Sequence, residues 1–193
     1  MKCHNNLTDQ QLIHSFLEGD VEAFSAIVNR HRNRIFTSIC LLVKDKYLAE
    51  DIFQEVFIRI IEKLKKGRYT DEGKFLPWAI RIAHNMCVDH FRKIKRCPAI
   101  KTSDGLNLFN DPVHAAPAAD YNLLNSQRQL GVKQMLDMLP EDQREVIILR
   151  HYGDMSFKEI AGITHCSINT ALGRMRYGLI NMRRMMTEKQ VAF

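Results

Sequence analysis

The chain has 193 residues, of which 46% are hydrophobic and 26% are charged, a balance typical of a folded protein rather than a disordered one. Lys and Arg number 28 against 22 for Asp and Glu, so the net charge of +6 permits a polyanionic partner without requiring one. No run of 18 apolar residues and no secretory signal appears, so we expect neither a membrane protein nor an exported one. Five scattered cysteines without a C-x-x-C pair favour a reduced, cytoplasmic chain over a disulfide framework.

The first half of the chain predicts four helices, because its apolar residues recur with a helical period and no alternating strand pattern appears. Thr8 and Asp20 suit the N-cap positions of the first two helices, and Gly19 stands between them where a helix commonly ends. Gly67 ends the third helix, and Pro77 suits the first turn of the fourth. The expected helices span residues 9–18, 21–43, 46–66 and about 77–96.

The third helix is expected to carry an acidic face. Four residues recur at helical spacing and so share one side of it: Asp51, Glu55, Ile58 and Glu62. The opposite side is broadly apolar, and residues 45–62 hold five acidic against two basic side chains. An ordinary solvated face explains the charge alone. The isoleucine within the acidic stripe favours a surface that binds a partner.

The fourth helix is expected to carry a basic face. Its core stripe consists of Ile80, Ala83, Cys87, Phe91 and Ile94. The opposite side collects Trp78, Ile82, Asn85, Asp89, Arg92, Lys93 and Arg96, with Arg81 at its flank. Cations on such a face can neutralise phosphates, an aromatic ring can stack on an unpaired base, and an amide can bind a base edge. The alternative is an ordinary basic surface helix with its tryptophan packed into a core.

Residues 97–120 are predicted to be a flexible linker, because they contain three prolines, several Asp, Asn and Ala residues and no apolar periodicity. A second helical set follows, expected at 121–138, 140–151, 156–163 and 167–186. Ser156 and Glu159 have the spacing of a capping box at the start of one of these helices. The sequence thus predicts an all-α protein with two small helical domains, 8–96 and 121–186, joined by the linker.

The last two predicted helices are typical of a helix-turn-helix, with residues 164–166 as the turn. The core stripe of the final helix is expected at Ile168, Leu172, Met175 and Leu179. The opposite face presents Ser167, Thr170, Gly173, Arg174, Tyr177 and Asn181, small and polar side chains of the kind that approach base edges and phosphates in a major groove. Gly173 lowers helix propensity on an exposed face, which indicates close approach of a partner. A helical hairpin without a DNA role is the alternative.

No pattern in the sequence predicts an enzyme or a cofactor. His84, Cys87 and His90 are spaced by three, but they spread over a third of the helix circumference and Cys87 belongs to the core stripe, so we do not expect a metal site. No glycine-rich phosphate loop, H-E-x-x-H or G-x-S-x-G motif is present.

In chain order, these segments resemble the sigma-70 family of bacterial transcription initiation factors. Residues 49–57, Ala-Glu-Asp-Ile-Phe-Gln-Glu-Val-Phe, resemble region 2.2, which docks on RNA polymerase. Residues 75–89 resemble regions 2.3 and 2.4, which melt and read the −10 promoter element. Residues 139–146 and 159–174 resemble region 4.2, which reads the −35 element. With only these two domains, the chain resembles the minimal, extracytoplasmic-function group.

The resemblance implies a role for three sets of residues. Contacts with core RNA polymerase are implied for Asp51, Gln54, Glu55 and Ile58. Contacts with the −10 element are implied for Trp78, Arg81, Asn85, Asp89, Arg92, Lys93 and Arg96. Contacts with the −35 element are implied for Ser167, Asn169, Thr170, Gly173, Arg174 and Tyr177. The 67–76 loop is then expected to hold an unstacked base.

The resemblance also implies partners and shows departures. Core RNA polymerase and promoter DNA are the implied partners, together with an anti-sigma factor, which in this family is often membrane-bound. His165 stands where the turn often has Gly, and residues 171–173, Ala-Leu-Gly, replace a commoner Val-Lys-Ser. The missing lysine removes a phosphate contact.

Two other classes of protein explain the sequence less completely. A self-sufficient helix-turn-helix regulator needs a dimer interface or a ligand pocket, and the first domain shows neither a heptad seam nor a pocket signature. A pure protein-interaction module leaves the basic face of the fourth helix and the helix-turn-helix unexplained. A mobility shift with and without core polymerase separates the three classes.

Overall fold

The computed structural model describes residues 6–69, 73–96 and 123–188, with side chains from residue 130 onward in the last range. Within these ranges the chain forms helices and no strand, which confirms the predicted all-α class. The chain divides into two compact units between residues 116 and 117. The predicted linker, 97–120, lies outside the described residues except for this division.

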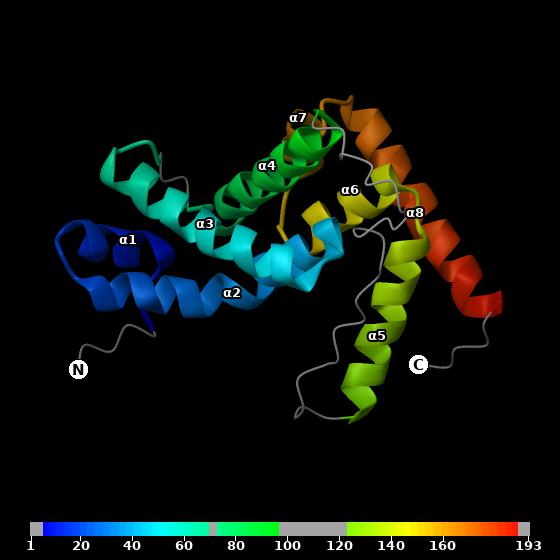
Figure 1. Cartoon of the computed structure of the whole chain (residues 1–193), viewed down its shortest axis with the longest axis horizontal. Helices are drawn as coiled ribbons and strands as arrows, with labels where there is room; N and C mark the ends of the chain where they lie inside the picture. Colours follow the sequence, from blue (N-terminus) through cyan, green and yellow to red (C-terminus); the bar gives the residue numbers. More distant parts are fainter. Residues whose placement is uncertain (1–5, 70–72, 97–122, 189–193) are drawn as a thin grey trace, which may run out of the picture. The chain divides into compact units, whose positions relative to one another are not determined.

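The first unit holds four helices, which Figure 1 shows in blue to green. They are α1 (Asp9–Leu17), α2 (Val21–Val43), α3 (Lys46–Lys65) and α4 (Phe75–Arg96). Helices α2, α3 and α4 pack on one another in every pairing, and α1 lies along α2. The predicted bounds of the first three helices agree with these to within a residue, and α4 begins two residues before Pro77.

Local hydrogen bonds explain why these helices begin where they do. The Thr8 hydroxyl accepts from the Gln11 backbone N–H at 3.3 Å, and the Gln11 side chain accepts from the Thr8 N–H at 2.9 Å. The Asp20 carboxylate accepts from two backbone N–H groups of the first turn of α2. Both predicted N-caps are therefore confirmed, and Gly19 takes a φ of +106° that favours glycine between the two helices.

The core of the first unit is formed by one apolar face from each helix. Phe57 of α3 is part of it, with its ring centroid 4.9 Å from that of Phe53 and 6.2 Å from that of Phe24. Two positions of α4 differ from the predicted stripe. Ile82, expected on the open side, is buried, whereas Ile94, expected in the core, is 57% exposed, because residues 92–96 at the end of α4 are exposed on every side.

A polar network holds the start of α1 against α2. The carboxylate of Asp9 accepts from His31 Nε2 at 2.8 Å and from Arg30 Nη1 at 2.6 Å, and Arg30 also donates to the carbonyl oxygen of Leu7 at 2.8 Å. The His31 ring is buried and packs against Phe75, with 5.3 Å between centroids. The hydrogen bond from His31 lowers the pKa of Asp9, outweighing the opposite effect of partial burial.

Replacing Asp9 by Asn should lower the stability of the first unit by about 1–2 kcal/mol at pH 7, because a charged hydrogen-bond acceptor is lost. A lowered carboxyl pKa contributes stability that is present above the ordinary value of about 4 and is lost as pH falls through the folded value. The difference in the free energy of unfolding between wild type and D9N should therefore disappear as the pH is lowered. Urea unfolding followed by Trp78 fluorescence measures it, since this is the chain's single tryptophan. Glu18→Gln, at an exposed acid, serves as the control, and a gap independent of pH would contradict the assignment.

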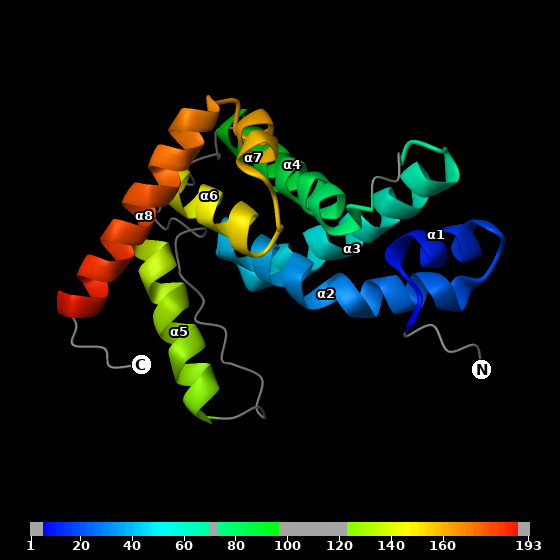
Figure 2. The same ribbon diagram turned by 180° about the vertical axis from the view of Figure 1, so that it is seen from behind.

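The second unit also holds four helices, coloured from green to red in Figure 1. They are α5 (Leu123–Met138), α6 (Glu141–His151), α7 (Phe157–Ile163) and α8 (Ile168–Glu188). Figure 2 shows α6 and α7 against the same side of α8, and α5 touches α8 more lightly. The predicted capping box is confirmed: the Ser156 hydroxyl accepts from the Glu159 N–H, and the Glu159 carboxylate accepts from the Ser156 N–H at 2.7 Å.

The turn between α7 and α8 requires a left-handed residue. His165 has a φ of +51°, a region that glycine enters without steric cost and that histidine tolerates better than most residues. The expectation that glycine is common at this position therefore has a backbone reason.

The predicted core stripe of α8 is wrong. Ile168, Leu172 and Leu179 are between 44% and 49% exposed. The buried positions are Ala171, Gly178 and Met185, spaced by seven along an adjacent side of the helix, about a quarter turn away. The helix packs through small residues because these let its backbone approach α6. A Cβ at position 178 would lie 2.8 Å from Cδ1 of Ile147.

Two glycine-to-alanine variants in α8 should therefore have opposite effects. At Gly173 a Cβ would meet nothing within 4 Å, so G173A should raise stability by about 0.5–1 kcal/mol through helix propensity alone. At Gly178 the buried Ile147 side chain must move, so G178A should lower stability by about 1 kcal/mol despite the same propensity gain. Thermal unfolding by circular dichroism compares the two. The Trp78 signal of the first unit should not change. Equal shifts in both variants would contradict the packing of α8 on α6.

Candidate nucleic-acid and polymerase interface

The acidic face of α3 is solvent-exposed in the structure. Asp51, Gln54 and Glu55 are exposed, and the large apolar side chain of Ile58 is 57% exposed among them. The opposite side of the helix is buried, as predicted. Glu55 accepts from Arg59, one turn later, at 2.8 Å, in an exposed ion pair worth about 0.3–0.5 kcal/mol. The face thus presents acids around an apolar side chain.

The basic face of α4 is also present. The side chains at Arg81, Asn85, Asp89, Arg92, Lys93 and Arg96 are all exposed. Arg92 lies 3.5 Å from Asp89 in an ion pair open to solvent, so the acid offsets part of the local positive charge. The cations and the amide lie along more than three turns of one helix.

Trp78 does not project alone from α4, because it is half-buried in an aromatic cluster. Its ring centroid lies 4.6 Å from Tyr69 and 6.0 Å from Phe75, and these two rings are 6.3 Å apart. The cluster ties the segment before the α3–α4 loop to the start of α4. The sequence predicted no role for Tyr69. An aromatic residue in an otherwise polar loop was the signal that could have indicated one. Residues 70–72, the middle of the loop expected to hold a base, lie outside the described residues.

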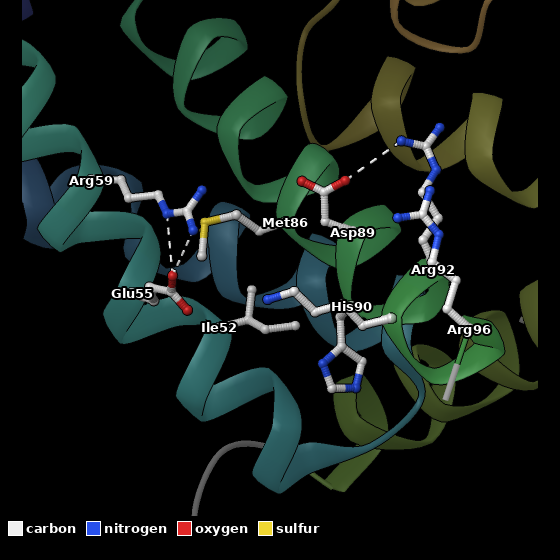
Figure 3. Close-up of a pocket in the computed structure, with 9 residues that line it drawn as sticks. Ile52, Glu55, Arg59, Met86, Asp89, His90, Arg92 and Arg96 are labelled. Atoms are coloured by element: carbon white, nitrogen blue, oxygen red, sulfur yellow. Dashed lines mark hydrogen bonds and ion pairs between the residues drawn. The ribbon is translucent and has the colours of Figure 1, made fainter. Parts of the chain in front are cut away.

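The residues of the two faces meet at one hollow of about 270 Å³ between α3 and α4 (Figure 3). Ile52 and Met86 project into it from the facing helices. Its lining is completed by Glu55, Arg59, Asp89, His90, Arg92, Lys93 and Arg96. The structure therefore brings Glu55, predicted to bind polymerase, together with residues predicted to bind the −10 element. Arg59, Met86 and His90 were missed, because the hollow exists only once the helices pair.

At the start of α8, two predicted DNA-binding residues have a local structural role. The Ser167 hydroxyl accepts from the Thr170 backbone N–H at 3.0 Å and lies 2.8 Å from the Thr170 hydroxyl. Ser167 therefore caps the helix. Asn169, between them, is exposed.

Further along α8, the structure divides the predicted DNA-binding face. Arg174 donates to Asp142 of α6 at 2.6 Å, and Asn181 donates to Gln143 of α6 at 2.9 Å. Both side chains thus turn toward α6. Tyr177 is 62% exposed, and the open space at Gly173 remains. Leu172 and Arg176, which were not predicted to bind DNA, are exposed on the outward side.

One thiol of the first unit has a strongly shifted pKa. Burial raises the pKa of the Cys87 thiol to about 12, so it is protonated at neutral pH. Among residues 6–69, 73–96 and 123–188, no three His, Cys, Asp or Glu side chains gather closely enough to hold a metal ion. No helix in the same ranges has the length and hydropathy to cross a membrane.

Comparison with known families accounts for both units. Residues 27–97 match the family described as Sigma-70 region 2, and residues 129–172 match Sigma-70, region 4. Together the two matches cover more than half of the chain. The first contains the acidic face of α3 and the basic face of α4, and the second runs from α5 through α6 and α7 to the start of α8.

Curated relatives align with nearly the whole chain. It is 29% identical over 172 residues to the RNA polymerase sigma-H factor of Pseudomonas aeruginosa, covering 86% of this chain and 88% of that protein. It is 26% identical over 175 residues to the ECF RNA polymerase sigma factor SigW of Bacillus subtilis, covering 89% and 92%. It is 28% identical over 173 residues to the ECF RNA polymerase sigma-E factor of Escherichia coli, covering 88% and 89%.

The chain therefore belongs to the sigma-70 family of promoter-recognising initiation factors. Within the family it is a sigma factor of the extracytoplasmic-function type, which carries out no enzymatic reaction of its own.

Solved structures show the same fold. One is CnrH in complex with the cytosolic domain of CnrY, with a TM-score of 0.62 and 18% identity over 94% of this chain and 99% of that one. Another is the sigma factor RpoE in complex with the anti-sigma factor NepR from Bartonella quintana, with a TM-score of 0.65 and 23% identity over 86% and 98%.

Proposed function

We propose that the first unit binds core RNA polymerase through Asp51, Gln54, Glu55 and Ile58, and the −10 element through α4. The observation that carries this proposal is the hollow between α3 and α4, where Glu55 lies beside the cations of α4. Polymerase bound on α3 would then hold promoter DNA directly against the neighbouring helix. Acids around an exposed isoleucine suit a basic, partly apolar partner surface.

The −10 element is bound by two kinds of group on α4. Arg92, Lys93 and Arg96 neutralise backbone phosphates. Arg81 and Asn85 lie one turn apart and nearer Trp78, where an amide and a guanidinium can bind the edge of a separated base. The stacked Tyr69–Trp78 pair gives such a base an aromatic surface in place of its lost neighbour.

The −35 element is bound by the helix-turn-helix, with α8 in the major groove. Ser167 fixes the start of the helix, and its backbone N–H groups face the phosphates there. Asn169, Thr170 and Tyr177 are exposed for contact, and Gly173 lets the backbone come close. Arg174 contacts DNA through its guanidinium group, which Asp142 holds in place by accepting a hydrogen bond from it.

Each of the two domains binds its promoter element weakly on its own, and polymerase holds both domains on the same promoter. Once one element is bound, the second binding event becomes intramolecular and its effective concentration rises to the millimolar range. The 97–120 segment serves as the tether between the domains 8–96 and 121–186. The isolated protein should therefore bind duplex promoter DNA poorly.

The proposal extends to location and regulation. Core polymerase and promoter DNA place the protein in the bacterial cytoplasm. An anti-sigma factor, often a membrane-bound one in this family, is the expected regulator. Two solved relatives were crystallised with such a regulator or with the cytosolic domain of a partner protein, which supports this expectation.

The double variant Asp51→Ala with Glu55→Ala should bind core polymerase at least about tenfold more weakly, because it removes two exposed acids from the proposed contact. The fold should be intact, since the Glu55–Arg59 pair contributes little. Affinity is measured by fluorescence anisotropy with purified core enzyme. Glu18→Ala with Glu22→Ala changes the net charge equally at exposed positions away from α3 and should bind as wild type. Equal weakening in both double variants would show that net charge alone causes the effect, and it would contradict the proposed contact.

Arg174→Ala should reduce transcription from a −35-dependent promoter about tenfold, as expected for one lost arginine contact. Because Arg174 also pairs with Asp142, the loss has a second possible cause in α6–α8 packing. Asp142→Ala breaks the same pair and leaves the arginine in place. Retained activity in D142A with loss in R174A identifies a DNA contact. Equal losses in run-off transcription would assign Arg174 to packing instead.

A further inference from the structure

The outward side of α8 is unusually apolar for a helix that enters a DNA groove. Ile168 and Leu172 are close to half-exposed and lie one turn apart in its first two turns. They are not among the buried residues of α8, which are Ala171, Gly178 and Met185, so a large part of each side chain is left open. Single exposed apolar residues are ordinary, but two adjacent ones at the reading end of a recognition helix call for a contact.

The surroundings of Leu172 indicate what that contact is. Asn169 and Arg176, one turn to either side, are exposed on the same outward face. Gly173, the next residue, has nothing within 4 Å of where a Cβ would be, so the helix backbone can come close to a partner there. A cation, an amide and open backbone around a small apolar ridge fit the major groove of a polyanionic duplex.

A second copy of this chain fits the ridge less well. Arg176 lies one turn beyond Leu172 and is exposed, and pairing two copies along this face would bring their arginines together. The phosphates on either side of a DNA groove meet the same arginines with opposite charge.

We infer that Leu172, with Ile168 beside it, contacts the 5-methyl group of a thymine in the −35 element and selects an A·T pair at that position. This rests on the proposed placement of α8 in the major groove. In that groove only thymine presents a methyl group, whereas cytosine presents an amino donor at the neighbouring position. An aliphatic side chain buries the methyl group favourably and leaves an amino group without a partner. Leu172 is thus a specificity-determining residue.

The test uses holoenzyme reconstituted from the full chain and core polymerase. A −35 element is first selected from a random duplex library, and each thymine in it is then replaced singly by deoxyuridine, which removes only the methyl group. Wild type should lose about fourfold in affinity at one or two positions, as expected for one buried methyl group. Leu172→Gln, of similar length but polar, should bind thymine and deoxyuridine equally there.

A matched control separates this contact from a general loss of apolar surface. Leu179→Gln changes an equally exposed leucine two turns further along α8 and should keep the deoxyuridine sensitivity. The inference is overturned if wild type is insensitive at every thymine, or if L172Q stays as sensitive as wild type. Wild-type binding that depends on the −35 sequence but ignores the methyl groups rejects the inference and leaves the proposed function standing. Binding with no −35 dependence rejects both, whereas dimerisation of the isolated chain that is lost in L172Q rejects the inference alone.

Discussion

The approach of α8 to α6 at Gly178 fixes which side of the recognition helix is left for DNA. A Cβ at this position would lie 2.8 Å from Ile147 Cδ1, so the absence of a side chain at Gly178 lets the two helices approach there. This contact fixes the rotation of α8 about its own axis and so the direction of its other side chains. Arg174 and Asn181 fall beside the contact and bond to α6, whereas Leu172 and Arg176 face away from it. The absence of a Cβ at the buried position 178 therefore determines which side chains of α8 face outward, where they could contact a base.

In the first unit, two neighbouring helices each leave one charged face exposed. Helix α3 gives its apolar side to the core and keeps an acidic side exposed, and α4 does the same with a basic side. The two exposed sides meet at the hollow that contains Glu55 and Arg92. Charges of opposite sign thus line one hollow, while Val56 of α3 and Ile80 of α4 are buried in the interior.

Much of this architecture could be predicted from the sequence because its signals are local. Thr8, Asp20 and Ser156 cap helices through bonds within three residues, so their positions predict helix starts closely. The face of α8 was mispredicted because large apolar residues were taken as the core, whereas the true contact depends on small ones. The Tyr69–Trp78 stack and the Arg174–Asp142 pair join segments whose proximity only the tertiary structure establishes.

The short bond between Glu55 and Arg59 has a thermodynamic consequence. If a polymerase cation takes Glu55 as its partner, the Arg59 guanidinium is released into a hollow that already contains Arg92 and Arg96. With the contacts proposed above, the electrostatic potential at the basic face of α4 would then become more positive as polymerase binds. By reciprocity, DNA that attracts Arg59 would make Glu55 a better ligand for polymerase by the same factor. In the proposed complex, one exposed ion pair, small in its own energy, would thus link the affinities of the two partners.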